Sequence, residues 1–177
     1  MNRTNALYAV FAFALGATTV LVAKTKVTFD PKAYYVGNEP KAASAALLTE
    51  SEKLVGDDSW QRIAVGRVYY VSGDKAKGEA LFQSVLSGAK VGKGDIYRIA
   101  TAYAVAKDWD KAKPLFERAI ALDPGDDTGT MKVACWYNLN GDRKRAEELF
   151  DGAFGKNPDE VWHYTLAAGS YVGVAPF

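Results

Sequence analysis

The stretch IYRIATAYAVAKDWDKAKPLFERAIALDP, residues 96–124, has the pattern of two amphipathic helices joined by a short turn. In each half, apolar residues recur at the i, i+3, i+4 and i+7 spacing that places them on one face of a helix. These residues are Ile96, Ile99, Ala100 and Tyr103 in the first half and Ala112, Leu115, Phe116 and Ala119 in the second. Lys107-Asp108 forms the polar turn, so the stretch predicts a helical pair.

The same residue types recur along the chain every 34 residues. Tyrosine stands at 69, 103, 137 and 171, and a leucine–phenylalanine pair stands at 81–82, 115–116 and 149–150. Small residues recur at 66, 100, 134 and 168. Accidental spacing in an ordinary helical bundle would not align so many residue classes, and a fixed period of this length indicates stacked supersecondary units. We therefore predict an all-α solenoid of antiparallel helix pairs.

Helix boundaries carry their own signals. Asp74, Asp108 and Asp142 recur at the turn within each pair, where an aspartate carboxylate can accept a hydrogen bond from an unpaired backbone N–H. We expect these aspartates to cap the second helices. Asp123-Pro124 and Asn157-Pro158 are expected to follow the ends of those helices, because proline disfavours helical geometry in the preceding residue.

Over roughly residues 59–173 the chain resembles the tetratricopeptide repeat family. The family pattern has a small residue and a tyrosine in the first helix, then alanine, phenylalanine and a closing proline in the second. The matches are Ala100, Tyr103, Ala112, Phe116, Ala119 and Pro124 in the central unit and Ala134, Tyr137, Ala146, Phe150, Ala153 and Pro158 in the next. The unit that contains Gly66, Tyr69 and Phe82 departs from the pattern at Gly78 and Lys90. The resemblance implies a tetratricopeptide-type solenoid of three units that binds proteins.

The chain divides into five predicted segments. Residues 1–26 are expected to be a signal peptide or membrane anchor, and residues 27–39 a linker arm. Residues 40–58 are expected to form an N-terminal capping helix, which opens on Pro40, a residue favoured at the first helical position. Three repeat units are expected over 59–160, followed by a C-terminal capping helix and tail over 161–177.

The N-terminal segment has an export-type pattern. Arg3 precedes an apolar run from Ala6 to Ala23, and Lys24 and Lys26 follow it. A cleaved signal peptide and an uncleaved hydrophobic helix both fit. The run has the length of a short transmembrane span, for which about 17–25 residues are needed, and this favours the anchor. We expect the body of the chain to be exported or membrane-anchored, on the periplasmic face of a bacterial membrane.

Composition and motifs argue against catalysis. The net charge of +1 gives no field that would attract nucleic acid. The sequence has no HExxH motif, no paired-cysteine metal spacing and no glycine-rich phosphate loop. Cys135 and His163 are the single residues of their kinds, and one histidine alone makes neither a metal site nor a triad. We expect no enzymatic activity, no cofactor, no metal and no small-molecule substrate.

The family resemblance implies that binding takes place on the inner face of the first helices. Carried over by position, the candidate partner-binding residues are Trp60, Ile63, Arg67, Tyr70, Tyr97, Thr101, Met131, Asn138 and Trp162. Only Arg67 and Asn138 are of the types with which family members clamp a peptide carboxylate, so an apolar groove is expected instead. In the alternative interpretation, the chain fills its own groove with residues 27–37 or with the tail 173–177.

Two functions follow from this sequence. In the first, the chain is a scaffold that binds a peptide, a helix or a subunit surface and assembles or stabilises a membrane-associated complex. In the second, it is a transient regulatory or substrate-delivering accessory factor of an envelope enzyme or secretion system. Both need a protein partner, which the sequence does not name.

Overall fold

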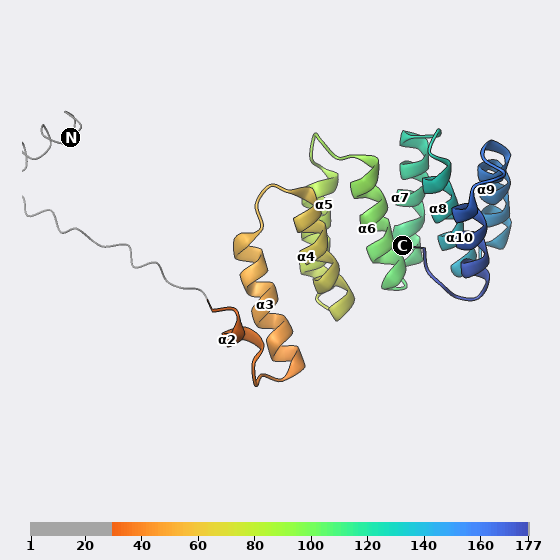
Figure 1. Cartoon of the computed structure of the whole chain (residues 1–177). Helices are drawn as coiled ribbons and strands as arrows, with labels where there is room; N and C mark the ends of the chain where they lie inside the picture. Colours follow the sequence, from red (N-terminus) through yellow and green to blue (C-terminus); the bar gives the residue numbers. More distant parts are fainter. Residues whose placement is uncertain (1–29, 177) are drawn as a thin grey trace, which may run out of the picture.

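The computed structural model describes residues 30–176, and all regular structure in that range is helical (Figure 1). Six of the helices form three consecutive pairs. The first helices of the pairs are α4 (Ser59–Ser72), α6 (Lys93–Val105) and α8 (Asp127–Leu139). The second helices are α5 (Lys75–Leu86), α7 (Trp109–Leu122) and α9 (Arg143–Lys156). The first helices begin 34 residues apart, as the second helices do, which confirms the predicted antiparallel pairs.

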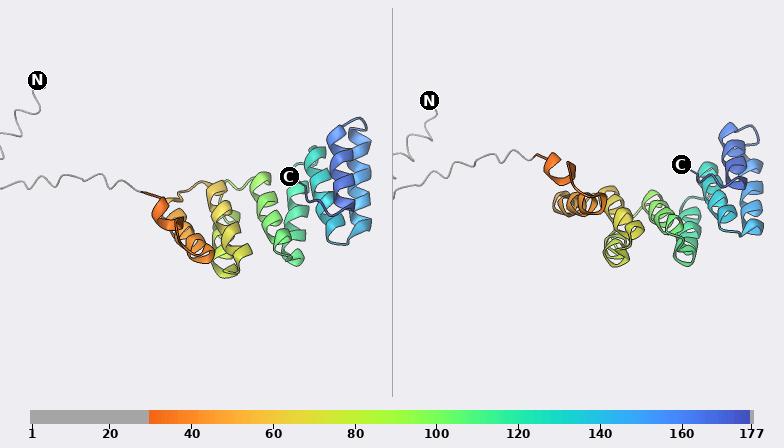
Figure 2. Two further views of the ribbon diagram at one scale, coloured as in Figure 1. Left: turned by 60° about the horizontal axis from the view of Figure 1, so that its bottom comes forward. Right: turned by 90° about the horizontal axis from the view of Figure 1, so that it is seen from below.

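Additional helices flank the three pairs. α2 (Lys32–Tyr35) and α3 (Pro40–Leu54) precede α4, and α10 (Val161–Tyr171) follows α9. Figure 2 shows that the pairs follow one another in a single row, with α3 at one end and α10 packed beside α8 and α9 at the other. The expected linker arm thus contains a one-turn helix, and α3 ends four residues before the boundary predicted at 58.

The predicted hydrophobic helix and targeting segment, residues 1–26, lie outside the described residues. Within residues 30–176, none of the helices combines the length and the apolar character that crossing a bilayer requires.

Two of the three expected aspartate caps form. Asp74 accepts a hydrogen bond from the backbone N–H of Lys77 at 3.3 Å, and Asp142 accepts one from Arg145 at 3.4 Å. The prediction for Asp108 is wrong, because its side chain makes no cap. Its carboxylate instead accepts a hydrogen bond from the hydroxyl of Tyr70, at 2.6 Å, and it lies 3.2 Å from the Lys75 ammonium. These tertiary donors lower the pKa of Asp108.

The aromatic residues of the repeat fill the interior between helices. Phe82, Phe116 and Tyr137 are fully buried, and Tyr103 is almost so. Phe82 and Tyr103 meet edge to face with ring centroids 5.3 Å apart, which joins α5 to α6. Such contacts add to the free energy gained by removing these rings from water. The core therefore runs without interruption from one pair to the next.

Two buried tyrosines also link successive second helices. Tyr103 donates to Glu79 at 2.9 Å, and Lys111 binds the other oxygen of the same carboxylate at 2.7 Å. One repeat later, Tyr137 donates to Glu117 at 2.6 Å, and Arg145 binds both carboxylate oxygens of Glu117 at 3.1 Å. Burial alone would raise the pKa of Glu117, but the bonds from Arg145 and Tyr137 hold it below its usual value.

Replacing Tyr137 with phenylalanine is expected to lower the free energy of unfolding by about 1–2 kcal/mol, because a hydrogen bond to a charged group is lost. Arg145 still pairs with Glu117, so the carboxylate is not left without a partner. Urea denaturation measures the change. The matched control is Tyr164→Phe, which removes a bond from an exposed tyrosine to the carbonyl of Pro158 and should have a smaller effect. Equal losses would contradict a stabilising role for the buried bond.

Candidate partner-binding face

A cavity of about 640 Å³ lies where α4, α6 and α8 face the C-terminal tail. We call it the inner cavity. Aromatic and aliphatic side chains dominate its wall, together with two arginines, and the lining contains no aspartate or glutamate. The residues that line it are Trp60, Ile63, Ala64, Arg67, Tyr97, Arg98, Thr101, Val105, Trp136, Ala175 and Pro176. The cavity is therefore mainly apolar, with positive charge on its wall.

The stacked pair of Trp60 and Arg98 forms the wall between α4 and α6. The guanidinium carbon of Arg98 lies 3.3 Å from the centre of the Trp60 ring, in the geometry of a cation–π contact. Arg98 also donates to the carbonyl of Gly94 at 3.4 Å. Trp60 is 59% exposed despite this contact. A large aromatic surface is thus held in position and remains open to a partner.

The wall at α6 and α8 is held by a bond between two aromatic residues. The indole N–H of Trp136 donates to the hydroxyl oxygen of Tyr97 at 3.3 Å. Both rings also pack on Phe116, whose centroid lies 5.6 Å from that of Tyr97 and 6.2 Å from that of Trp136. The shape of the cavity wall is therefore coupled to the core of the second pair.

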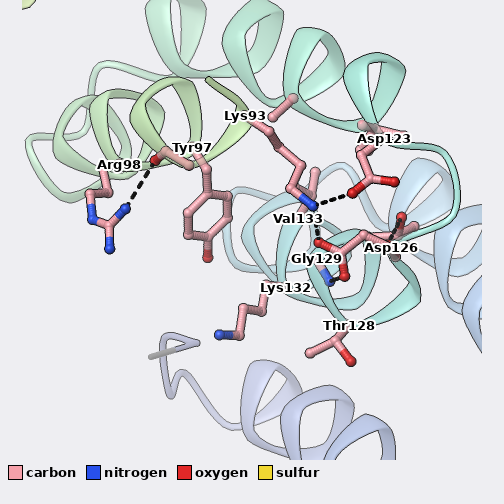
Figure 3. A pocket seen from close by; sticks show the side chains of 13 residues that line it. Lys93, Tyr97, Arg98, Asp123, Asp126, Thr128, Gly129, Lys132 and Val133 are labelled. Atoms are coloured by element: carbon pink, nitrogen blue, oxygen red, sulfur yellow. Dashed lines mark hydrogen bonds and ion pairs between the residues drawn. The ribbon is translucent and has the colours of Figure 1, made fainter. Parts of the chain in front are cut away.

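A second cavity, of about 390 Å³, adjoins the inner cavity and shares Tyr97 and Arg98 with it (Figure 3). Lys93 projects into it from α6 and lies 2.6 Å from both Asp123 and Asp126. These carboxylates neutralise Lys93. Lys132, on the α8 side, has no ion-pair partner within residues 30–176. This second cavity therefore adds a further uncompensated cation beside the two arginines.

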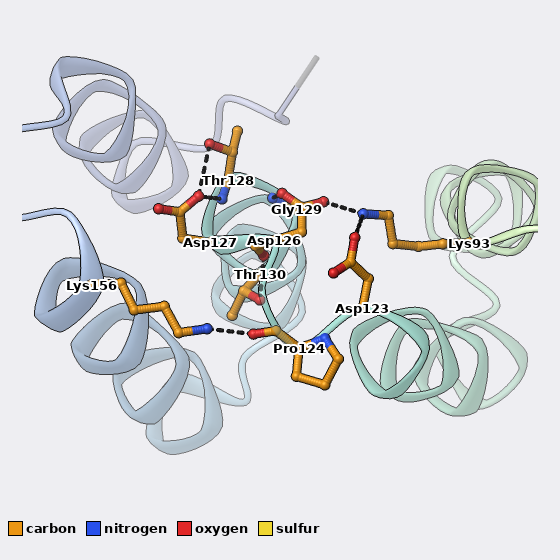
Figure 4. A network of polar contacts seen from close by, with 9 residues as sticks. All are labelled: Lys93, Asp123, Pro124, Asp126, Asp127, Thr128, Gly129, Thr130 and Lys156. Carbon is orange, nitrogen blue, oxygen red and sulfur yellow. Dashed lines mark hydrogen bonds and ion pairs between the residues drawn. The ribbon is translucent and has the colours of Figure 1, made fainter.

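The carboxylate network around Lys93 fixes the turn between α7 and α8 (Figure 4). Asp126 caps α8 by accepting a hydrogen bond from the backbone N–H of Gly129 at 2.8 Å, and its other oxygen binds Lys93. Lys156 of α9 donates to the carbonyl of Pro124. The start of α6, the turn and the end of α9 are thus tied together, which holds the first helices in register.

After α10 the C-terminal tail turns back along the row of helices toward its middle (Figure 1). Gly173 has a φ of +86°, a left-handed conformation that glycine adopts without steric strain. The N–H of Val174 then donates to the carbonyl of Gly169 at 2.9 Å, which closes the end of the helix in the manner of a Schellman motif. The reversal brings Ala175 and Pro176 onto the cavity wall. The tail thus takes up part of the groove, as one alternative anticipated.

The candidate residues from the sequence occupy different environments. Trp60, Ile63, Arg67, Tyr97 and Thr101 line the inner cavity. The placement of two others in the groove is wrong. Tyr70 is buried against Phe82 and Tyr103, and Met131 is fully buried. Asn138 is half-buried and donates to Ser170 at 3.0 Å, whereas Trp162 is exposed near the end of the stack. That these residues bind a partner stays a prediction.

The sequence prediction misses several wall residues, among them Arg98, Lys132 and Trp136. Trp136 is a large aromatic residue on a first helix, and this is the sequence feature that could have marked it as a wall residue. Nothing in the sequence indicates that Arg98 folds back over Trp60. Cys135 and His163 are both buried, and burial raises the pKa of the Cys135 thiol to about 11, so both residues belong to the packed interior.

The central pair matches a known family in sequence as well as in geometry. The family model described as tetratricopeptide repeat matches residues 95–126, which cover α6 from its first turn, the whole of α7 and the following turn. Residues 95–126 are a tetratricopeptide repeat. The pairs α4–α5 and α8–α9 have the same spacing and are consistent with further tetratricopeptide repeats. No curated protein and no solved structure matches the chain.

A tetratricopeptide repeat gives this chain the general role of a protein–protein interaction scaffold. Proteins of this kind are generally binding modules without catalytic activity. The inner cavity is lined mainly by the first helices α4 and α6, with Trp136 of α8 and the C-terminal tail.

Proposed function

We propose that this chain is an exported or membrane-anchored scaffold that binds another protein through the inner cavity, and so assembles or stabilises a membrane-associated complex. The observation that carries the proposal is the exposed, stacked Trp60–Arg98 pair beside Tyr97 and Trp136. Tryptophan, tyrosine and arginine dominate the residues that carry binding energy at protein interfaces. The apolar run from Ala6 to Ala23 supports the membrane part of the proposal.

The chemistry of the wall favours an apolar peptide, helix or subunit surface with a hydrogen-bond acceptor at its edge. The aromatic residues remove apolar groups of the partner from water, which stabilises the complex by about 25 cal/mol for each Å² buried. Arg67 is exposed and has no ion-pair partner in the described part of the chain, so its guanidinium is available for a carbonyl or carboxylate of the partner. A partner that fills the cavity must also contact or displace Ala175 and Pro176.

Replacing Trp60 and Arg67 with alanine is expected to reduce partner recovery at least tenfold, because truncating a binding hot spot costs about 2 kcal/mol or more. The tagged full-length chain would be cross-linked in the membranes of its source cells and purified. The recovered proteins are then quantified by mass spectrometry. Both residues lie on the surface of α4, so their removal should leave the fold intact, which circular dichroism checks.

The matched control is Arg118→Ala with Leu122→Ala, which also removes one arginine and one large apolar side chain from the surface of a single helix. Neither residue lines a cavity described above. Unchanged recovery with the Trp60 and Arg67 variant, or an equal loss with the control, would show that the inner cavity is not the binding site. Recovery at a fixed ratio through detergent purification identifies a constitutive subunit rather than a transient factor.

A further inference from the structure

The last helix in the described range, α10, leaves an apolar stripe only partly covered. The stripe follows helical spacing and consists of Val161, Tyr164, Ala168, Tyr171 and Val172, all of which are exposed. One edge of Tyr164 and of Tyr171 packs on α9, through Phe154 and Phe150. None of the stripe residues is charged. A helix that closes a solenoid needs a polar outer face, because no further repeat covers it. The stripe on α10 is therefore unlike the outer face of a terminal cap.

The repeat register shows what normally covers these positions. Tyr171 is 49% exposed, whereas Tyr103, two periods earlier on α6, is 2% exposed. Ala168 is likewise exposed, whereas its counterpart Ala100 is fully buried. The difference is that α6 is paired with a second helix, α7, whereas no helix follows α10 in the described range. Within the part of the chain that the structure describes, α10 is thus a first helix with no second helix packed on it.

At the other end of the stack, α3 has the features of a second helix. One period before the second helix α5, α3 carries Ser44, Leu47 and Leu48, which repeat the small, bulky, bulky pattern of Gly78, Leu81 and Phe82. Ser51 stands at the position of Val85. The start and end of α3 are also in register with those of α5, within two residues. Leu48 packs on Val65 and Tyr69 of the next helix, as a second helix should. α3 is therefore a second helix.

Within residues 30–176, only the one-turn α2 precedes α3 at the place where the repeat predicts a first helix. α2 spans four residues, against 13 or 14 in α4, α6 and α8, and it buries none of its own residues. Leu47 is 39% exposed, whereas the corresponding Leu81 and Leu115 are partly buried and Leu149 on α9 is 7% exposed. Ser44, Leu47 and Leu54 leave an uncharged strip on α3 that is partly open to solvent.

We infer that two copies of this chain associate head to tail, with α10 of one copy packed against α3 of the other to complete a repeat unit. The contact continues the interface that joins α4 to α5, α6 to α7 and α8 to α9. The residues named on both surfaces are uncharged. Arg143, whose guanidinium lies 5.2 Å from the centre of the Tyr171 ring, is already paired with Glu147, so no unpaired charge is buried when the surfaces meet. α10 takes the place on α3 that the one-turn α2 holds in the single chain. The contact uses two different surfaces, so it leaves a free end on each copy and extends into longer assemblies.

The test is a pair of surface variants mixed together. Ala168→Arg places a long charged side chain in the stripe on α10, and Leu47→Arg does so on α3. Light scattering coupled to size-exclusion chromatography then measures the mass of the full-length chain in detergent over a range of concentrations. The unaltered chain is expected to reach at least twice the mass of one copy, and each variant alone is expected to stay monomeric. An equal mixture is expected to give a dimer and nothing larger, because only one intact α10–α3 contact forms.

The outcomes separate this contact from the alternatives. A folded, unaltered chain that stays monomeric at every concentration would overturn the inference. So would assembly lost on Ala168→Arg but kept on Leu47→Arg, since that pattern indicates two α10 stripes packed on each other or a different protein on α10. Association through residues 1–29 would survive both substitutions. The Trp60 and Arg67 variant is expected to assemble normally, so this inference and the proposed function fail independently.

Discussion

Replacing Phe116 with alanine is expected to lower the free energy of unfolding by about 3–5 kcal/mol, the largest stability effect we anticipate. Phe116 is fully buried in the middle pair, where it packs on Tyr97, Trp109 and Trp136 with ring centroids 5.6–6.2 Å apart. Truncation removes the buried ring and leaves a hole that neighbouring helices fill only in part. Urea denaturation followed by circular dichroism measures the loss.

The same substitution should weaken partner binding, because Tyr97 and Trp136 line the inner cavity and rest on Phe116. The control is Leu122→Ala on the same helix, where the side chain is 55% exposed and little apolar surface is lost. We expect that variant to change stability by less than about 1 kcal/mol. If the two variants lost similar stability, Phe116 would not occupy the centre of a packed core.

Replacing Gly78 with alanine is expected to destabilise the protein by about 1–3 kcal/mol, although alanine favours helices more than glycine does. A Cβ at position 78 would lie 2.7 Å from the carbonyl oxygen of Gly66, 2.7 Å from the Cβ of Tyr70 and 2.8 Å from the backbone nitrogen of Tyr70. Backbone atoms of α4 cannot give way locally, so α4 and α5 would have to separate. Thermal or urea unfolding measures the change.

Gly152→Ala is the matched control for this prediction. Gly152 lies within α9, and a Cβ there would have no neighbour within 4 Å. Alanine at that position should stabilise the protein by about 0.5–1 kcal/mol, through helix propensity and a less flexible unfolded chain. A gain in stability from Gly78→Ala similar to that from Gly152→Ala would show that α4 and α5 do not approach as closely as the structure indicates.

Gly78 shows what the repeat pattern can and cannot predict. The family pattern has alanine at the position of Gly78, so the sequence alone suggests that glycine is a weakness of the first unit. In the structure the glycine is required, because α4 and α5 cross in contact there. In the central pair, Ala112 stands at the position of Gly78 and Ala100 at the position of Gly66; both alanines are fully buried. The distance between two helices depends on the residues of both helices. A family pattern gives the preferred residue at each position separately, so it does not predict that distance.

The candidate binding site likewise separates what the repeat pattern predicts from what the structure adds. Trp60, Ile63, Arg67, Tyr97 and Thr101 were placed on the inner face from their position in the repeat, and they line the inner cavity. Tyr70 was placed there by the same rule but is buried. A helix turns by about 100° per residue, so a position at the edge of a face is covered or open according to its neighbours. Here Phe82 of α5, Tyr103 of α6 and the carboxylate of Asp108 enclose the Tyr70 ring.

Helical periodicity, turn residues and the 34-residue period are enough to predict the helices, their pairing and their order, because these signals act over a few neighbouring positions. Which surfaces the helices leave open depends instead on contacts between whole helices. The stacking of Arg98 on Trp60, the return of Ala175 and Pro176 to the inner cavity and the exposed stripe on α10 join residues distant in sequence or depend on which helices lie beside them. Such contacts depend on how side chains from several helices pack together, and a local pattern of residues does not predict that packing.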